Sequence, residues 1–169
     1  LYDYTGFPPH TYELKYDAPG SPETSARVKE LLATAGIPLK EDATRGFDHG
    51  LFVPFLKIYP KADIPILQLS IRSDYNPRAH LELGKALAPL RREGVLIVGS
   101  GFSFHNLRRF SDPDGSSDQF DAWLTSAVET PDEKTRWQAL EQWEKAPRAR
   151  ICHPQEDHLV PLFVAAGAA

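Results

Sequence analysis

Residues 95–106 read Val-Leu-Ile-Val-Gly-Ser-Gly-Phe-Ser-Phe-His-Asn. The first four are aliphatic, and an uninterrupted aliphatic run is typical of a strand that is buried on both faces in the middle of a sheet. Gly99 and Gly101 end the run, and His105 follows. Because ligands collect beyond the carboxyl ends of strands in open α/β sheets, His105 is placed for chemistry. The alternative, which the local pattern leaves equally open, is a surface-loop histidine without a role.

A second aliphatic run, Ile64–Ile71, predicts another strand, and Asn76 caps a predicted helix that extends to about Glu93. Strand, helix and strand at this spacing form a βαβ unit, whose crossover is right-handed. The apolar stripe of the helix leaves His80 and Glu82 outside it, so both are expected to be solvated. The fold class that follows is α/β, with a central mixed or mostly parallel sheet flanked by helices on both faces.

The first half of the chain carries two further helix signals. Ser21 precedes a proline and an acid, which predicts a helix that Gly36 stops. Asp48 can cap Leu51–Tyr59, which places His49 at the N-terminus of that helix. His49 is then either a locally hydrogen-bonded cap residue or a neutral imidazole that faces an anionic substrate.

The remaining segments give simpler predictions. Helices are expected over Gln119–Val128 and after Thr130, the second with a tryptophan stripe that belongs to the core. His153–Leu162 is typical of a helix start and carries two histidines and two acids. Short strands are expected at Tyr12–Tyr16 and Pro38–Glu41.

The composition limits the function classes. The chain has 169 residues, 41% hydrophobic and 25% charged, with a formal net charge of −4, as in one globular domain. It has no basic cluster with interleaved aromatic residues, so nucleic acid is not expected as a partner. No apolar segment reaches about 18 residues, so no membrane span is expected. Cys152 is the only cysteine, which excludes an internal disulfide and favours a reducing, cytoplasmic setting.

Four stretches share their order and spacing with the motifs of one enzyme family: Gly6–Pro8, Gly46–Gly50, Gly99–Leu107 and His153–Leu162. Together they resemble the class III extradiol ring-cleavage dioxygenases, and within these the 4,5-DOPA dioxygenase branch. The resemblance implies an α/β sandwich that forms a single domain over 1–169, incomplete because the N-terminal part of the family fold is absent. It also implies a mononuclear non-haem Fe(II) site, which zinc can occupy, where a catechol-type substrate (DOPA-like or protocatechuate-like) binds beside O2.

The resemblance also assigns residues. His158 matches a metal-ligating residue near the family's C-terminus. His105 matches an active-site histidine that is the acid/base in one branch and a metal ligand in others. His49 matches a histidine that faces the substrate or supports the metal ligands, and we expect it to take part in catalysis and in substrate binding. Phe7 and Tyr12, in an aromatic loop, are also expected to bind substrate. His49, His105 and His158 are therefore expected to converge.

The chain departs from the family pattern in two ways. Phe102 stands where the family phrase has asparagine, and two histidine ligands that the family carries earlier in its fold have no counterpart here. A second chain or a missing segment would then supply those ligands, and the isolated chain is expected to be inactive. The alternatives are a non-catalytic metal-binding or interaction relative of the same fold, and a metal-dependent, hydrolase-like reaction at the same histidines.

Overall fold

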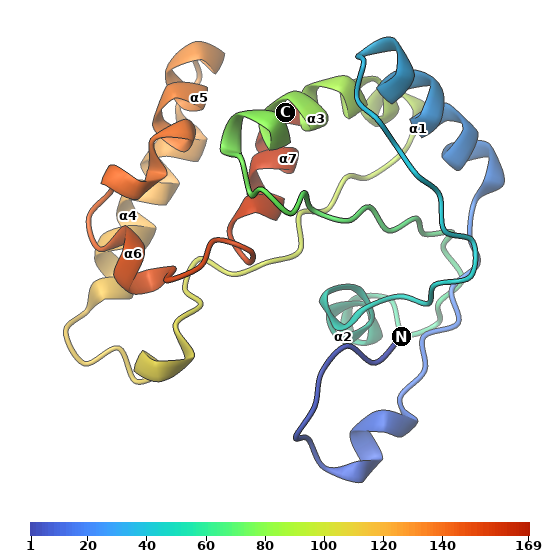
Figure 1. The fold of residues 1–169 in the computed structure, drawn as a ribbon, viewed down its shortest axis with the longest axis horizontal. Coiled ribbons are helices and arrows are strands. Elements are labelled where there is room, and N and C mark those ends of the chain that lie inside the picture. Colours follow the sequence, from blue (N-terminus) through green and yellow to red (C-terminus); the bar gives the residue numbers. More distant parts are fainter. The chain divides into compact units, whose positions relative to one another are not determined.

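The computed structural model describes all 169 residues and divides the chain into two compact units, Leu1–Ser70 and Ile71–Ala169. Every regular element in it is a helix (Figure 1). None of the helices has both the length and the apolar character that crossing a bilayer requires.

The first unit contains the 3-10 helix η1 (Pro9–Glu13) and the α-helices α1 (Pro22–Thr34) and α2 (His49–Ile58). As predicted, Ser21 caps α1 and Asp48 caps α2, because each side chain accepts a hydrogen bond from the backbone N–H three residues further on. The small core of this unit is made by buried side chains of the N-terminal segment and α2: Tyr16, Leu51 and Phe52.

The second unit consists of five α-helices and three 3-10 helices. They are α3 (Pro77–Leu87), η2 (Ala88–Glu93), η3 (Leu107–Arg109), α4 (Ser116–Glu129), α5 (Glu133–Glu141), η4 (Trp143–Lys145), α6 (Ala149–Cys152) and α7 (Val160–Ala168). The helices predicted after Asn76, over 119–128 and after Thr130 are thereby confirmed. The predicted tryptophan stripe lies in the core, with Trp137 and Trp143 both buried.

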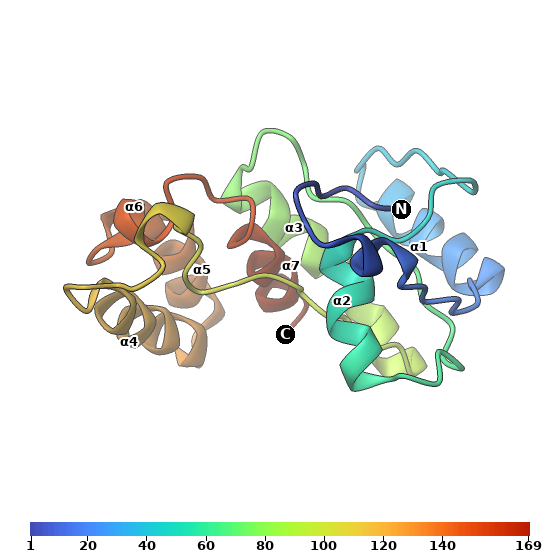
Figure 2. The same ribbon diagram turned by 90° about the horizontal axis from the view of Figure 1, so that it is seen from below.

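Helices α3 and α7 cross at backbone contact (Figure 2). A Cβ on Gly84 of α3 would lie 2.0 Å from the carbonyl oxygen of Val164, and one on Gly167 of α7 would lie 2.0 Å from that of Leu81. No side chain fits at either position, so these two glycines permit the crossing. The crossing fixes the C-terminal helix, and with it the segment that leads into α7.

The predicted α/β fold is wrong, because the structure contains no strand and no sheet. The runs at 64–71 and 95–98 carry no regular secondary structure, and 12–16 and 38–41 form no strands either. In the run at 95–98, Leu96 is 76% exposed, whereas a central strand would bury it.

The physical reason lies in strand pairing. A strand exists only where a neighbouring backbone takes its N–H and C=O groups, and that neighbour is not encoded in the run itself. The backbone bonds of the runs go elsewhere: Ile66 N–H donates to the carbonyl of Pro19, and Val95 N–H to that of Leu90. The aliphatic pattern identified apolar segments correctly but not their partners.

Two local predictions also need correction. His80 is fully buried rather than solvated, because its ring bonds the backbone on both sides. Its Nδ1–H donates to the carbonyl of Asn76 at 2.7 Å, and its Nε2 accepts the N–H of Arg72 at 3.1 Å. The helix expected from His153 begins only at Val160, since Pro161 suits the first turn of α7.

Candidate metal centre

The loop that follows residues 95–98 is hydrogen-bonded to the segment that precedes α7. Phe102 N–H donates to the carbonyl of His158, and His105 N–H donates to the carbonyl of Cys152, both at 2.9 Å. As residue numbers rise in one segment they fall in the other, so the two run antiparallel. These backbone bonds bring His105 and His158 to the same place.

Two side chains reinforce the attachment. The Nε2–H of His153 donates to the carbonyl of Ser103 at 3.0 Å, and the amide of Asn106 donates to the carbonyl of Ile151 at 2.7 Å. His153 is fully buried between core rings, and this burial lowers its pKa, so the ring stays neutral. A neutral ring that donates through Nε2 acts here as a structural clamp on the loop.

The Gly-Ser-Gly motif has a steric explanation. A Cβ on Gly99 would lie 2.4 Å from the carbonyl oxygen of Pro161, and one on Gly101 would lie 2.1 Å from that of His158. The two backbones approach so closely that only glycine fits at these positions. The motif therefore does not end a strand, as its sequence predicts, but allows the loop to pack against the segment before α7.

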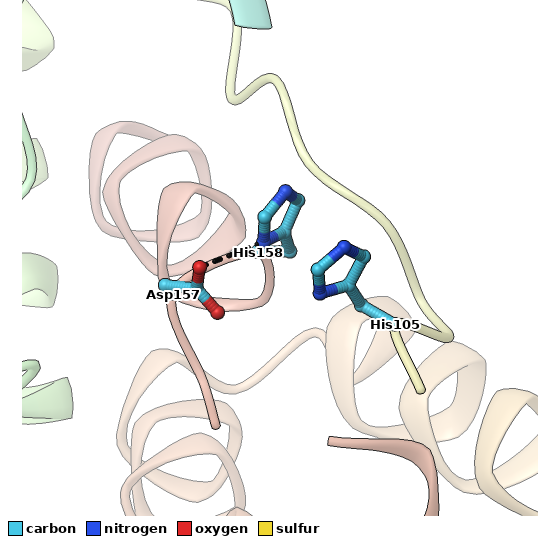
Figure 3. A group of neighbouring side chains, drawn as sticks. All are labelled: His105, Asp157 and His158. Carbon is cyan, nitrogen blue, oxygen red and sulfur yellow. Dashed lines mark ion pairs between the residues drawn. The ribbon is translucent and has the colours of Figure 1, made fainter. Parts of the chain in front are cut away.

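Three potential ligands meet at this place. His105, Asp157 and His158 each offer a ligand atom, and these atoms all lie within 4.8 Å of one another (Figure 3). The two imidazole rings are stacked, with centroids 3.4 Å apart and an interplanar angle of 17°. The ring of Phe102 lies against both, at 6.2 Å from His105 and 6.0 Å from His158.

The donor set is one that divalent metals use, and because the two rings are stacked, a metal shared by both would require one ring to turn. The Asp157 carboxylate lies 2.9 Å from Nδ1 of His158, yet that nitrogen is buried and makes no hydrogen bond. A buried nitrogen without a hydrogen-bond partner, beside a carboxylate and a second imidazole, has the surroundings of a ligand atom. Two imidazoles and one carboxylate are also the facial ligand set of non-haem Fe(II) oxygenases.

A small cavity borders this group. Its volume is about 240 Å³, and its lining includes Phe102, His158 and Leu162, together with Asp121 and Thr125 of α4. His158 therefore has one side toward His105 and Asp157 and another toward open space.

The other predicted site residues lie in the first unit and form an aromatic cluster around Tyr4. The Tyr4 ring contacts Phe7 at 5.1 Å, Tyr12 at 5.3 Å and His49 at 5.9 Å between centroids. The predicted substrate-binding residues are thus neighbours. That they bind substrate, and that His49 converges with His105 and His158, stay predictions.

His49 is held by Asp3, which the sequence did not identify. One carboxylate oxygen of Asp3 accepts the backbone N–H of His49 at 3.0 Å, and the other lies 2.9 Å from Nδ1 of its ring. Partial burial acts to raise the pKa of Asp3, but the hydrogen bonds from His49 outweigh it and lower that pKa below its usual range. Asp3 is therefore ionised at neutral pH.

Asp157 is the other functional candidate that the sequence missed. The sequence pattern places the two acids before His158 at a predicted helix start and does not distinguish them as ligands. The signal that could have identified Asp157 is its position directly before His158, which the resemblance matches to a metal ligand. Its placement depends on the loop after residue 152, which residue spacing alone does not predict.

Comparisons with known proteins show the family to which this chain belongs. The family described as the catalytic LigB subunit of aromatic ring-opening dioxygenase matches residues 1–169. A 4,5-DOPA dioxygenase extradiol of Beta vulgaris is 43% identical over 100% of this chain and 64% of its own length. The Escherichia coli protein of the same name is 38% identical over 99% of this chain and 63% of its own length. A dioxygenase named tasH, from Hapsidospora irregularis, is 42% identical over 100% of this chain and 56% of its own length.

A solved structure is similar as well. The crystal structure of an uncharacterised Escherichia coli K12 protein matches 93% of this chain and 66% of its own, with a TM-score of 0.77 and 33% sequence identity. The chain spans about 56–64% of the length of the named relatives above. It belongs to the LigB family of aromatic ring-opening dioxygenase subunits, as the four motifs predicted.

Proposed function

We propose that this chain carries the metal-binding part of an extradiol dioxygenase that opens the ring of a catechol, DOPA-like or protocatechuate-like, with O2. The observation that carries the proposal is the approach of His105, Asp157 and His158 to within 4.8 Å, in a chain of a ring-opening family. Two imidazoles and a carboxylate hold Fe(II) on one side and leave the other positions for substrate and oxygen.

In this proposal His105, Asp157 and His158 hold Fe(II), and Zn(II) can take the same ligands. The bound iron supplies the redox chemistry that joins catechol and O2. The backbone bonds from Phe102 and His105 to the segment 152–158 keep the ligands in place before the metal arrives. The antiparallel attachment thus brings together candidate ligands that are about 50 residues apart in sequence.

Phe7, Tyr12 and His49 face the substrate, as the resemblance implies. To His49 we also assign the proton transfer with a catechol hydroxyl group, because an imidazole can both accept and donate a proton. Phe7 and Tyr12 contact the aromatic ring of the substrate through edge or offset stacking. The reducing cytoplasm stays our proposed location, on the basis of the single cysteine.

Asp157 raises the number of candidate metal ligands in this chain, and a low number of ligands was the reason to expect inactivity. The sequence identifies only His158 and His105, whereas the structure adds a third candidate ligand on the same chain. The inactivity of the isolated chain nevertheless stays a prediction, because the chain covers only 63–64% of the length of two DOPA dioxygenase relatives. A test of ring opening therefore needs this chain to be joined to the remaining part of a relative.

The experiment uses the Escherichia coli relative for this purpose. Residues 1–169 replace the aligned 63% of the relative, and the chimera is loaded anaerobically with Fe(II). Oxygen uptake is then followed with L-DOPA and with protocatechuate. We expect catechol-dependent uptake by the chimera, its loss in the His158→Ala chimera, and its retention in a His10→Ala control, since His10 is an exposed histidine of η1.

Two results with the chimera would contradict the proposal. A folded chimera that binds one iron and consumes no oxygen with either catechol contradicts ring opening and favours the non-catalytic metal-binding relative. A folded chimera that binds no iron contradicts the metal site itself. The same oxygen assay on the 169-residue chain alone tests the expected inactivity.

A further inference from the structure

The contact between Asp3 and His49 has a feature that a simple attachment does not require. A single hydrogen bond from the backbone N–H of His49 would be enough to fix the N-terminal segment on α2. Asp3 makes that bond through Oδ1, at 3.0 Å, and in addition directs Oδ2 to the ring nitrogen Nδ1, at 2.9 Å. Both oxygens of one carboxylate are thus committed to one histidine.

The second contact determines which ring nitrogen carries the proton. An ionised carboxylate only accepts hydrogen bonds, so Nδ1 of His49 must carry its hydrogen toward Asp3. In the neutral ring, Nε2 is then the unprotonated nitrogen and offers a lone pair. The ring is also oriented, because Tyr4 packs edge-on against it with an interplanar angle of 88°.

The exposure of the ring makes this orientation useful. The side chain of His49 is 45% exposed, so the ring is open to a ligand while its Nδ1 side is held. In carboxylate–histidine pairs of enzymes, the acid fixes the tautomer and the imidazole does the proton transfer. The parts of such a pair are present here at the start of α2.

We propose that Asp3 is the positioning residue of His49: it holds the imidazole with Nδ1 protonated, so that Nε2 accepts a proton from a hydroxyl group of the substrate. This inference rests on the proposed function only for the identity of that hydroxyl, a catechol O–H. The tautomer and its dependence on Asp3 are properties of the 169-residue chain and do not need turnover.

The deciding measurement is nitrogen NMR of the whole 169-residue chain with labelled histidine. Two-bond couplings between ring hydrogens and ring nitrogens distinguish a protonated Nδ1 from a protonated Nε2, and a His49→Gln variant assigns the signals. At a pH where the ring is neutral, we expect Nδ1–H for His49. An Nε2–H signal in the unaltered chain contradicts the proposal whatever the variants do.

Variants at Asp3 then test the cause. Asp3→Ala removes both acceptors, and Asp3→Asn leaves one carbonyl oxygen for two donors, so both should lose the single Nδ1–H state. Asp3→Glu keeps the carboxylate and should restore it in part. Asp17→Asn is the matched control, an exposed aspartate of the same unit, and should leave the spectrum of His49 unchanged. If Asp3→Ala and Asp3→Asn both retain Nδ1–H, Asp3 is only a structural attachment.

Kinetics in the active chimera provide a second readout. Loss of the correctly protonated imidazole should lower kcat by about 100-fold, within the range for general acid–base groups, and change KM much less. A change in KM alone would assign Asp3 to substrate binding and contradict a positioning role. If the chimera proves inactive, the proposed function fails while the NMR result still decides the role of Asp3, so the two failures are distinguishable.

Discussion

The Gly101→Ala substitution tests how the metal centre is assembled. The added Cβ would lie 2.1 Å from the carbonyl oxygen of His158, whereas ordinary contact begins at 3.4 Å. The loop and the segment before α7 must therefore separate by more than an ångström. Because the obstacle is backbone on both sides, no side-chain rotation relieves it.

The expected cost follows from two contributions. Forcing a methyl group into a packed contact costs about 1–3 kcal/mol. The bond from Phe102 N–H to the carbonyl of His158, now 2.9 Å, would be lost, at about 1 kcal/mol. The free energy of unfolding should therefore fall by about 2–4 kcal/mol. Since the same movement displaces His158 from His105, metal affinity should fall about 10–100-fold, as when groups that orient ligands are removed.

The assays are urea unfolding of the metal-free chain and titration with Co(II) or Fe(II) under anaerobic conditions. Gly20→Ala is the matched control, because a Cβ there meets nothing within 4 Å. It should change the free energy of unfolding by no more than about 1 kcal/mol, toward greater stability. A Gly101→Ala chain with wild-type stability and wild-type metal affinity would refute the close backbone approach as the basis of the site.

Three further predictions concern the same unit. Asp157→Asn should weaken Fe(II) binding at least about 10-fold and leave urea unfolding unchanged. The control Glu156→Gln, which removes a partner of Arg150, should leave Fe(II) affinity unchanged. Equal Fe(II) affinities of the Asp157→Asn chain and the unaltered chain would exclude Asp157 as a ligand. Burial raises the pKa of the Cys152 thiol to about 11, so it should react with a disulfide reagent at about pH 8 only as fast as the chain unfolds. Because the thiol ionises more readily in the unfolded chain, the free energy of unfolding should fall as the pH rises from 9.0 toward 11. Rapid reaction of the folded chain with the reagent would contradict the burial of Cys152. Burial lowers the pKa of His153, so its contribution to stability is complete above pH 6.5 and is lost as the pH falls below that value. The His153→Gln variant keeps a donor for Ser103 and should flatten the dependence of stability on pH below 6.5. An unchanged dependence would count against a neutral ring that holds the loop.

The helices could be predicted from the sequence because their signals are local. Ser21, Asp48 and Asn76 each accept a hydrogen bond from the N–H three residues later, so a single side chain and its neighbours determine the start. His80 shows the limit of such patterns. It lies outside the apolar stripe, yet the N–H of Arg72 outside the helix satisfies its ring and permits burial.

The sheet could not be predicted correctly, since strand formation depends on a partner far away in sequence. The run at 95–98 has the composition of a central strand, but Leu96 and Val98 are exposed here. The candidate site was partly accessible. The motif resemblance singled out His105 and His158, whereas Asp157 and Asp3 became candidates only when non-local hydrogen bonds and side-chain distances were known.

The central claim is that His105, Asp157 and His158 together hold the metal. The most direct measurement is X-ray absorption at the iron edge of the Fe(II)-loaded chain, which counts the imidazoles bound to the metal. We expect two imidazoles bound to the iron in the unaltered chain and one in the His158→Ala chain. A spectrum without imidazole scattering, or one that His158→Ala leaves unchanged, would contradict it.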